Sequence, residues 1–230
     1  WKSVSRTSTN LGVNLSGLTP EHDYVYRVIG YDKRSNRGTP SEEITVTTLK
    51  DTICPKVTKI TPDPGYFKSE INLRFTAEDD YRVKSIEIQT STDKESWKTV
   101  SEIKATGESA KCTFDCKLDL KNYEEGSVFV RAKVYDSYGN VTEDKDLTCY
   151  EYVVDRTAPI QPTGVTASSG ETEGGSSFVN ISWNAITDDN SFAYYRVYKS
   201  NSADGEFTLL KNNVKTVNTY DENVDFSATY

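Results

Sequence analysis

The strongest constraint on the fold is an internal repeat with an offset of 104 residues. The segment Asp51–Pro55 returns as Asp155–Pro159, and Tyr31-Asp32 with Asn36 returns as Tyr135-Asp136 with Asn140. A period of this length is too long for a solenoid repeat and matches a whole domain. The sequence therefore predicts similar domains placed one after another along the chain.

Within each period the sequence alternates between apolar and polar residues, as β-strands do. The clearest runs are Ile71–Phe75, Lys111–Leu118 and Val179–Trp183. A period of two residues indicates a strand with one face in a core and the other in water. Turn-forming clusters separate the runs, and no run shows the spacing of an amphipathic helix. These patterns predict an all-β protein made of β-sandwiches.

Charge and hydropathy exclude two classes of partner. The chain carries a net charge of −8, whereas proteins that bind nucleic acid need a basic surface. No apolar run approaches the roughly 18 residues that a membrane-spanning helix requires. We expect neither nucleic-acid binding nor membrane insertion within this segment.

The first and last periods resemble fibronectin type III domains. Trp183 stands where that family keeps a core Trp on its second strand, and Tyr195–Tyr198 resembles the third strand. Leu18 to Tyr24 matches the family's tyrosine corner, in which the phenol oxygen bonds back to the backbone near the Leu. Tyr230 closes a similar segment 206 residues after Tyr24, about two periods later.

The middle period departs from that pattern and resembles a bacterial immunoglobulin-like module. Phe75 replaces the core Trp, and Val128 stands where the corner Tyr belongs. The resemblances imply tandem immunoglobulin-like and fibronectin type III β-sandwiches. The expected boundaries are residues 1–50, 51–156 and 157–230, with both terminal modules incomplete and completed by a longer parent chain or by another copy.

All four cysteines fall in the middle module. Cys54 and Cys149 are expected on its first and last strands, which commonly run side by side in sandwiches of this kind, and they form our candidate disulfide. Cys112 and Cys116 lie about 13 Å apart along one strand, too far to bond without distortion. The alternative is four buried thiols that act as small apolar residues.

Two acidic loops offer candidate calcium ligands. Asp79 and Asp80, and likewise Asp188 and Asp189, follow equivalent strands, and calcium prefers clustered oxygens. The alternative is loop capping, in which Asp side chains accept hydrogen bonds from nearby backbone N–H groups. The spacing of a helix–loop–helix calcium loop is absent, so capping is favoured and no metal or other cofactor is assigned.

Catalysis is not expected. The chain has a single histidine, His22, and neither a nucleophile elbow nor a Gly-rich phosphate loop accompanies it. We therefore expect a non-catalytic chain.

The resemblance implies a spacer or adhesion array in a large secreted or cell-surface bacterial protein. Short linkers that run into Pro55 and Pro159 would stiffen the junctions. The expected partners are other modules of the same chain and a protein or glycan at the surface. An alternative is a carbohydrate-binding accessory role in a multimodular glycoside hydrolase, with aromatic side chains as the sugar platform. The candidate platform residues are Trp1, Tyr66, Trp97, Tyr138 and Tyr194.

Overall fold

The computed structural model describes residues 14–222 and residue 224, and it is almost entirely β. Thirteen strands form several separate sheets, and one 3-10 turn, η1 (Asp144–Asp146), is the single helical element among these residues. The predicted all-β fold class is confirmed.

The chain divides into two compact units, of which the second contains most residues after Tyr152 together with Tyr66–Lys68 and Tyr123–Gly126.

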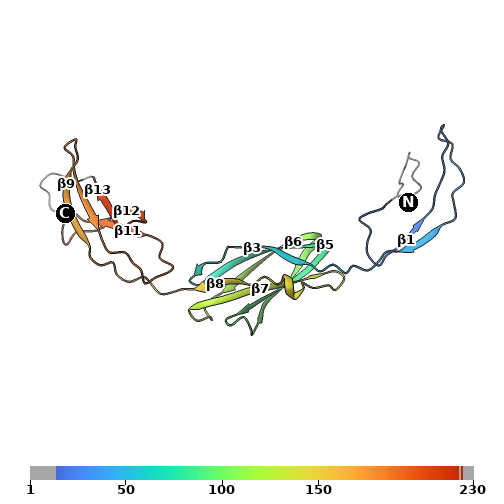
Figure 1. The fold of residues 1–230 in the computed structure, drawn as a ribbon, viewed down its shortest axis with the longest axis horizontal. Helices are drawn as coiled ribbons and strands as arrows, with labels where there is room; N and C mark the ends of the chain where they lie inside the picture. Colours follow the sequence, from blue (N-terminus) through green and yellow to red (C-terminus); the bar gives the residue numbers. More distant parts are fainter. Residues whose placement is uncertain (1–13, 223, 225–230) are drawn as a thin grey trace. The chain divides into compact units, whose positions relative to one another are not determined.

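The largest sheet has six strands, drawn from cyan to yellow in Figure 1. Its strand order is β3-β5-β7-β8-β4, with β6 paired to β5. All the pairings with a defined register are antiparallel except β4 with β8, which is parallel. The strands are β3 (Lys56–Thr61), β4 (Tyr66–Phe67), β5 (Glu70–Ser91), β6 (Lys98–Asp119), β7 (Gly126–Asp136) and β8 (Tyr150–Val154).

Strand β5 organises this sheet because it pairs with β3, β6 and β7. Its first half buries every second side chain, Ile71, Leu73, Phe75 and Ala77, while the residues between them are exposed or half-buried. Phe75 is 1% exposed and lies opposite Phe114 of β6. Strand β6 shows the same alternation from Phe114 to Leu118, so the predicted period-two pattern forms the core.

The first part of the chain contains one two-stranded antiparallel sheet in the described residues. It pairs β1 (Asp23–Tyr26) with β2 (Ile44–Thr47). The Tyr24 hydroxyl accepts a hydrogen bond of 2.9 Å from the Thr19 backbone N–H, next to half-buried Leu18. This is the bond that a tyrosine corner makes. Tyr230, the second corner residue of the sequence pattern, and Trp1 lie outside the described residues.

The last part of the chain contains a three-stranded sheet and a hairpin. Strands β9 (Thr166–Glu171), β10 (Ser177–Ser182) and β13 (Asn218–Asp221) form the sheet, and β11 (Tyr195–Lys199) pairs with β12 (Thr208–Val214).

Aromatic packing joins this sheet to the hairpin. Trp183, which follows β10, is buried and meets the Tyr195 ring edge-on at 5.0 Å between centroids. Lys199 of β11 pairs with buried Asp221 of β13 at 2.9 Å. The predicted contrast between the two faces is weak in β10, because all of its side chains are half-buried.

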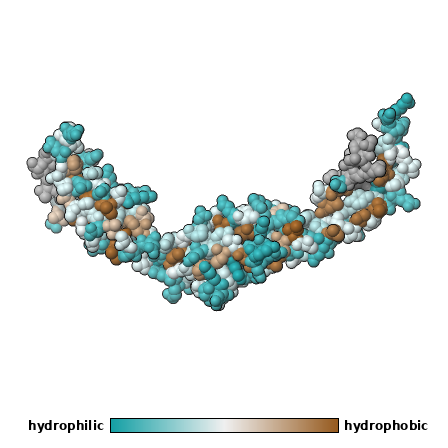
Figure 2. Space-filling model, in the orientation of Figure 1, coloured by the Kyte–Doolittle hydropathy of each residue, from teal (hydrophilic) through white to brown (hydrophobic). Residues whose placement is uncertain are grey.

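The surface around the six-stranded sheet is mainly hydrophilic, with small apolar areas between the polar residues (Figure 2). Among the described residues, no helix has the length and apolar character needed to cross a membrane.

Replacing Phe75 with Ala tests whether β5 carries the core. We expect the free energy of unfolding to fall by about 3–5 kcal/mol, because a buried ring is lost and a cavity remains. The matched control is Arg74→Ala on the same strand, which removes an exposed ion pair with Asp115 and costs about 1 kcal/mol or less. Urea denaturation measures both, and equal losses would contradict the assignment of Phe75 to the core.

Candidate functional site

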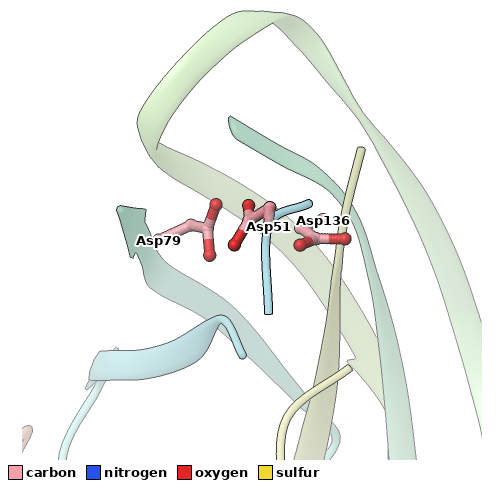
Figure 3. A group of neighbouring side chains, drawn as sticks. All are labelled: Asp51, Asp79 and Asp136. Atoms are coloured by element: carbon pink, nitrogen blue, oxygen red, sulfur yellow. The ribbon is translucent and has the colours of Figure 1, made fainter. Parts of the chain in front are cut away.

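Three carboxylates meet at one end of the six-stranded sheet. One side-chain oxygen each from Asp51, Asp79 and Asp136 lies within 4.8 Å of the other two. Figure 3 shows the Asp51 and Asp79 carboxylates facing each other, with Asp136 next to Asp51. Asp51 and Asp136 are buried and Asp79 is half-buried. Three separate segments supply them: the stretch before β3, an irregular part of β5 and the end of β7.

Asp136 is held by a tight turn that follows β7. Its Oδ1 accepts hydrogen bonds from the backbone N–H groups of Tyr138 (2.9 Å) and Asn140 (2.7 Å). Its Oδ2 accepts a third, of 2.6 Å, from the Asn140 side-chain amide. Asp and Asn favour turns because their side chains bond to backbone nearby in this way. The carboxylate is therefore fixed in position by local contacts alone.

Asp79 lies where the register between β5 and β6 breaks, after Glu78. At this irregular part of β5, Asp79 Oδ2 accepts hydrogen bonds from the N–H groups of Tyr81 (3.0 Å) and Arg82 (2.8 Å). The other oxygen, Oδ1, is buried and has no hydrogen-bond partner. One oxygen of the Asp79 carboxylate is therefore held by two hydrogen bonds, and the other oxygen has none.

In Asp51, too, one carboxylate oxygen is hydrogen-bonded and the other has no partner. Its Oδ1 accepts a hydrogen bond of 2.9 Å from the Ile53 N–H, while Oδ2 is buried without a partner. The Asn140 amide also donates to the Asp51 backbone carbonyl at 3.3 Å. Asn140 therefore contacts both Asp51 and Asp136 and holds the first segment against the turn after β7.

The charges in this cluster are poorly compensated. Among the described residues, no Lys or Arg forms an ion pair with any of the three carboxylates. Two like charges about 4 Å apart repel by roughly 4 kcal/mol at the effective dielectric near a protein surface. Hydrogen bonds to charged groups contribute about 1.5–3 kcal/mol each, so the donors offset part of the repulsion, but they do not reach the unpartnered oxygens of Asp51 and Asp79.

The pKa of Asp79 reflects this environment. Burial raises the pKa above its ordinary value, and the neighbouring charges of Asp80 and Asp136 raise it further. The N–H groups of Tyr81 and Arg82 act in the opposite direction and do not cancel the effect. Ionisation of Asp79 therefore costs more free energy in the folded chain than ionisation of an exposed aspartate.

The turn at Asp136 occurs a second time in the chain. Asp32 Oδ1 accepts hydrogen bonds of 2.8 Å from the N–H groups of Arg34 and Asn36, and Oδ2 accepts 2.7 Å from the Asn36 amide. The repeated sequence thus produces a repeated local structure. Asp32 is exposed, however, and within the part of the chain that the structure describes it belongs to no carboxylate cluster.

Of the four predicted calcium candidates, Asp79 alone belongs to the cluster. Asp80 and Asp188 are exposed. Asp189 Oδ1 accepts hydrogen bonds from the Ser191 N–H and hydroxyl at 2.7 and 2.6 Å, which is the loop-capping role. The sequence pattern contained Asp51 and Asp136 as landmarks of the repeat, but nothing in it indicated that they approach Asp79.

The structure does not join Cys54 to Cys149, and the predicted disulfide is corrected accordingly. All four cysteines are free thiols. The expectation assumed that the first and last strands are neighbours, whereas β5 and β7 stand between β3 and β8 in the sheet. Burial raises the pKa of both thiols. The charge of Glu143 raises the pKa of Cys54 further, whereas the charges of Lys94 and Arg131 act against the rise at Cys149.

No model of a known protein family matches the chain, and the search of curated proteins gave no significant match. The site is therefore interpreted from its own geometry. Its oxygen atoms are the ligand type that hard cations prefer.

Asp79→Asn tests the electrostatic cost of the cluster. In the presence of a chelator at pH 7, we expect the variant to unfold at a higher urea concentration than the wild type. The amide oxygen still accepts the backbone hydrogen bonds, and the unfavourable charge is gone. Because the folded pKa is raised, the wild type gains stability as the pH falls through that pKa, so the difference should shrink toward pH 4.

The matched control is Asp188→Asn, which removes an exposed charge outside the cluster and should have little effect. Lower stability of Asp79→Asn at pH 7 under chelation would contradict the account.

Proposed function

We propose that this chain is part of a non-catalytic spacer and adhesion array in a large secreted or cell-surface protein of bacterial type. The observation that carries the proposal is repetition. The same turn is built at Asp32–Asn36 and again at Asp136–Asn140, 104 residues later. Recurrence of a whole-domain unit is typical of chains whose length and stiffness are the functional property.

The segment that leaves the six-stranded sheet is fastened in a way that suits a load-bearing role. The parallel pairing places Phe67 of β4 beside Val154 of β8, and the Asp155 N–H donates to the Phe67 carbonyl at 3.0 Å. Glu125 then accepts hydrogen bonds from the Arg156 N–H (2.9 Å) and the Thr157 hydroxyl (2.8 Å). A pull along this segment loads several of these bonds together.

The carbohydrate-binding alternative needs exposed aromatic rings, and two of its candidates are packed. Trp97 lies under the Arg131 guanidinium at 3.9 Å, and its indole N–H donates to the Lys94 carbonyl. The Tyr138 ring packs on Tyr81 at 5.4 Å. These contacts weaken Trp97 and Tyr138 as platform residues, whereas the candidates Tyr66 and Tyr194 are exposed.

Single-molecule force spectroscopy tests the proposal. We expect a discrete unfolding peak that releases about 330–360 Å of chain less its folded end-to-end distance, since about 100 residues lie between Lys56 and Val154 and each extends by about 3.3–3.6 Å. Glu125→Ala should lower the force of this peak because the exit segment loses two hydrogen bonds.

The matched control is Glu124→Ala, which removes an adjacent exposed charge and should leave the force unchanged. Gradual extension at low force, without a peak, would refute a load-bearing role.

A further inference from the structure

The carboxylate cluster has two features that a set of exposed acidic residues lacks. Asp51 is 6% exposed, its Oδ2 is buried and unpartnered, and its carboxylate faces that of Asp79 (Figure 3). Asp79 Oδ1 is likewise buried and unpartnered. Buried polar atoms in folded proteins are almost always satisfied by a partner. Two unsatisfied anionic oxygens at one point therefore indicate a missing positive group.

We propose that Asp51, Asp79 and Asp136 bind one divalent cation, and that this cation is calcium. Calcium binds oxygen ligands at about 2.3–2.6 Å, so ligands on opposite sides of one ion lie up to about 5 Å apart. The observed limit of 4.8 Å between the carboxylate oxygens agrees with this spacing.

The ligand set also argues against other metals. Zinc and copper sites in proteins use His and Cys ligands, and this cluster offers carboxylate oxygen alone. Magnesium demands a near-ideal octahedron at shorter distances, whereas calcium accepts irregular geometry and a larger ligand number. The three carboxylates are held by local backbone hydrogen bonds in three separate segments, and no segment fixes the ligand geometry for the other two, which suits the more tolerant ion.

Binding has a structural consequence, because the ligands come from separate segments. Asp51 belongs to the stretch before β3, while Asp79 and Asp136 belong to turns of the sheet itself. The Ser137 N–H donates to the Arg82 carbonyl at 3.1 Å, so the two turns already touch. The cation therefore ties the stretch Asp51–Pro55 to the end of the sheet and makes its order depend on calcium.

Isothermal titration of the metal-free chain with calcium chloride tests the site directly. We expect one saturable site per chain with a Kd on the order of 10⁻⁴–10⁻³ M, the range of extracellular calcium modules. Asp136→Asn should weaken binding at least about tenfold, because ligand charge sets calcium affinity. Absence of saturable calcium binding, or tighter binding of magnesium than of calcium, would overturn the proposal.

The matched control is Asp32→Asn. Asp32 makes the same turn as Asp136 but stands outside the cluster, so this variant should bind calcium as the wild type does. Equal loss of binding in the two variants would show that the measured ion is not bound at the cluster.

A second readout covers the case in which Asp136→Asn fails to fold. Calcium should raise the Tm of the wild type and slow amide exchange at Ile53, Tyr81 and Arg82, whose N–H groups donate to the liganding carboxylates. In Asp51→Asn, which keeps an acceptor for Ile53, both effects should disappear. Unchanged exchange at these amides in saturating calcium would contradict the proposal.

The site does not depend on the load-bearing role, and a chain that binds calcium but unfolds without a force peak would refute that role alone.

Discussion

The burial of one face of β5 is the constraint on which the six-stranded sheet depends. This strand pairs with three others, and its alternate side chains fill the core from Ile71 to Ala77 and again at Ile86 and Ile88. A slip of one residue in register would turn every one of these side chains to water. The register of β5 with its neighbours therefore places Asp79, on β5 itself, near Asp136 at the end of β7.

Local hydrogen bonding explains why the repeated sequence yields repeated structure. The turns at Asp32 and Asp136 use the same three donors with nearly the same distances. The linker motif repeats as well: Asp51 caps the N–H of Ile53, and Asp155 caps the N–H of Thr157. Each motif needs only residues two to four positions apart, so each forms wherever its sequence occurs.

For the same reason, some features could be predicted from the sequence and others could not. The alternation of Ile71, Leu73 and Phe75 depends on neighbours in the chain, and it predicted the buried face of β5 correctly. Sheet order depends on contacts between distant segments. The disulfide between Cys54 and Cys149 was inferred from an assumed order, and the pairing of β5 and β7 between β3 and β8 removed its basis.

The carboxylate cluster combines both kinds of information. Each of its residues sits in a local motif that the sequence can indicate, but the approach of Asp51 to Asp79 requires the folded sheet. Asp32 and Asp136 make the point most clearly, because identical turns leave one carboxylate exposed and bury the other among two like charges. Repetition supplies the parts of such a site, and the tertiary fold decides which copies are brought together.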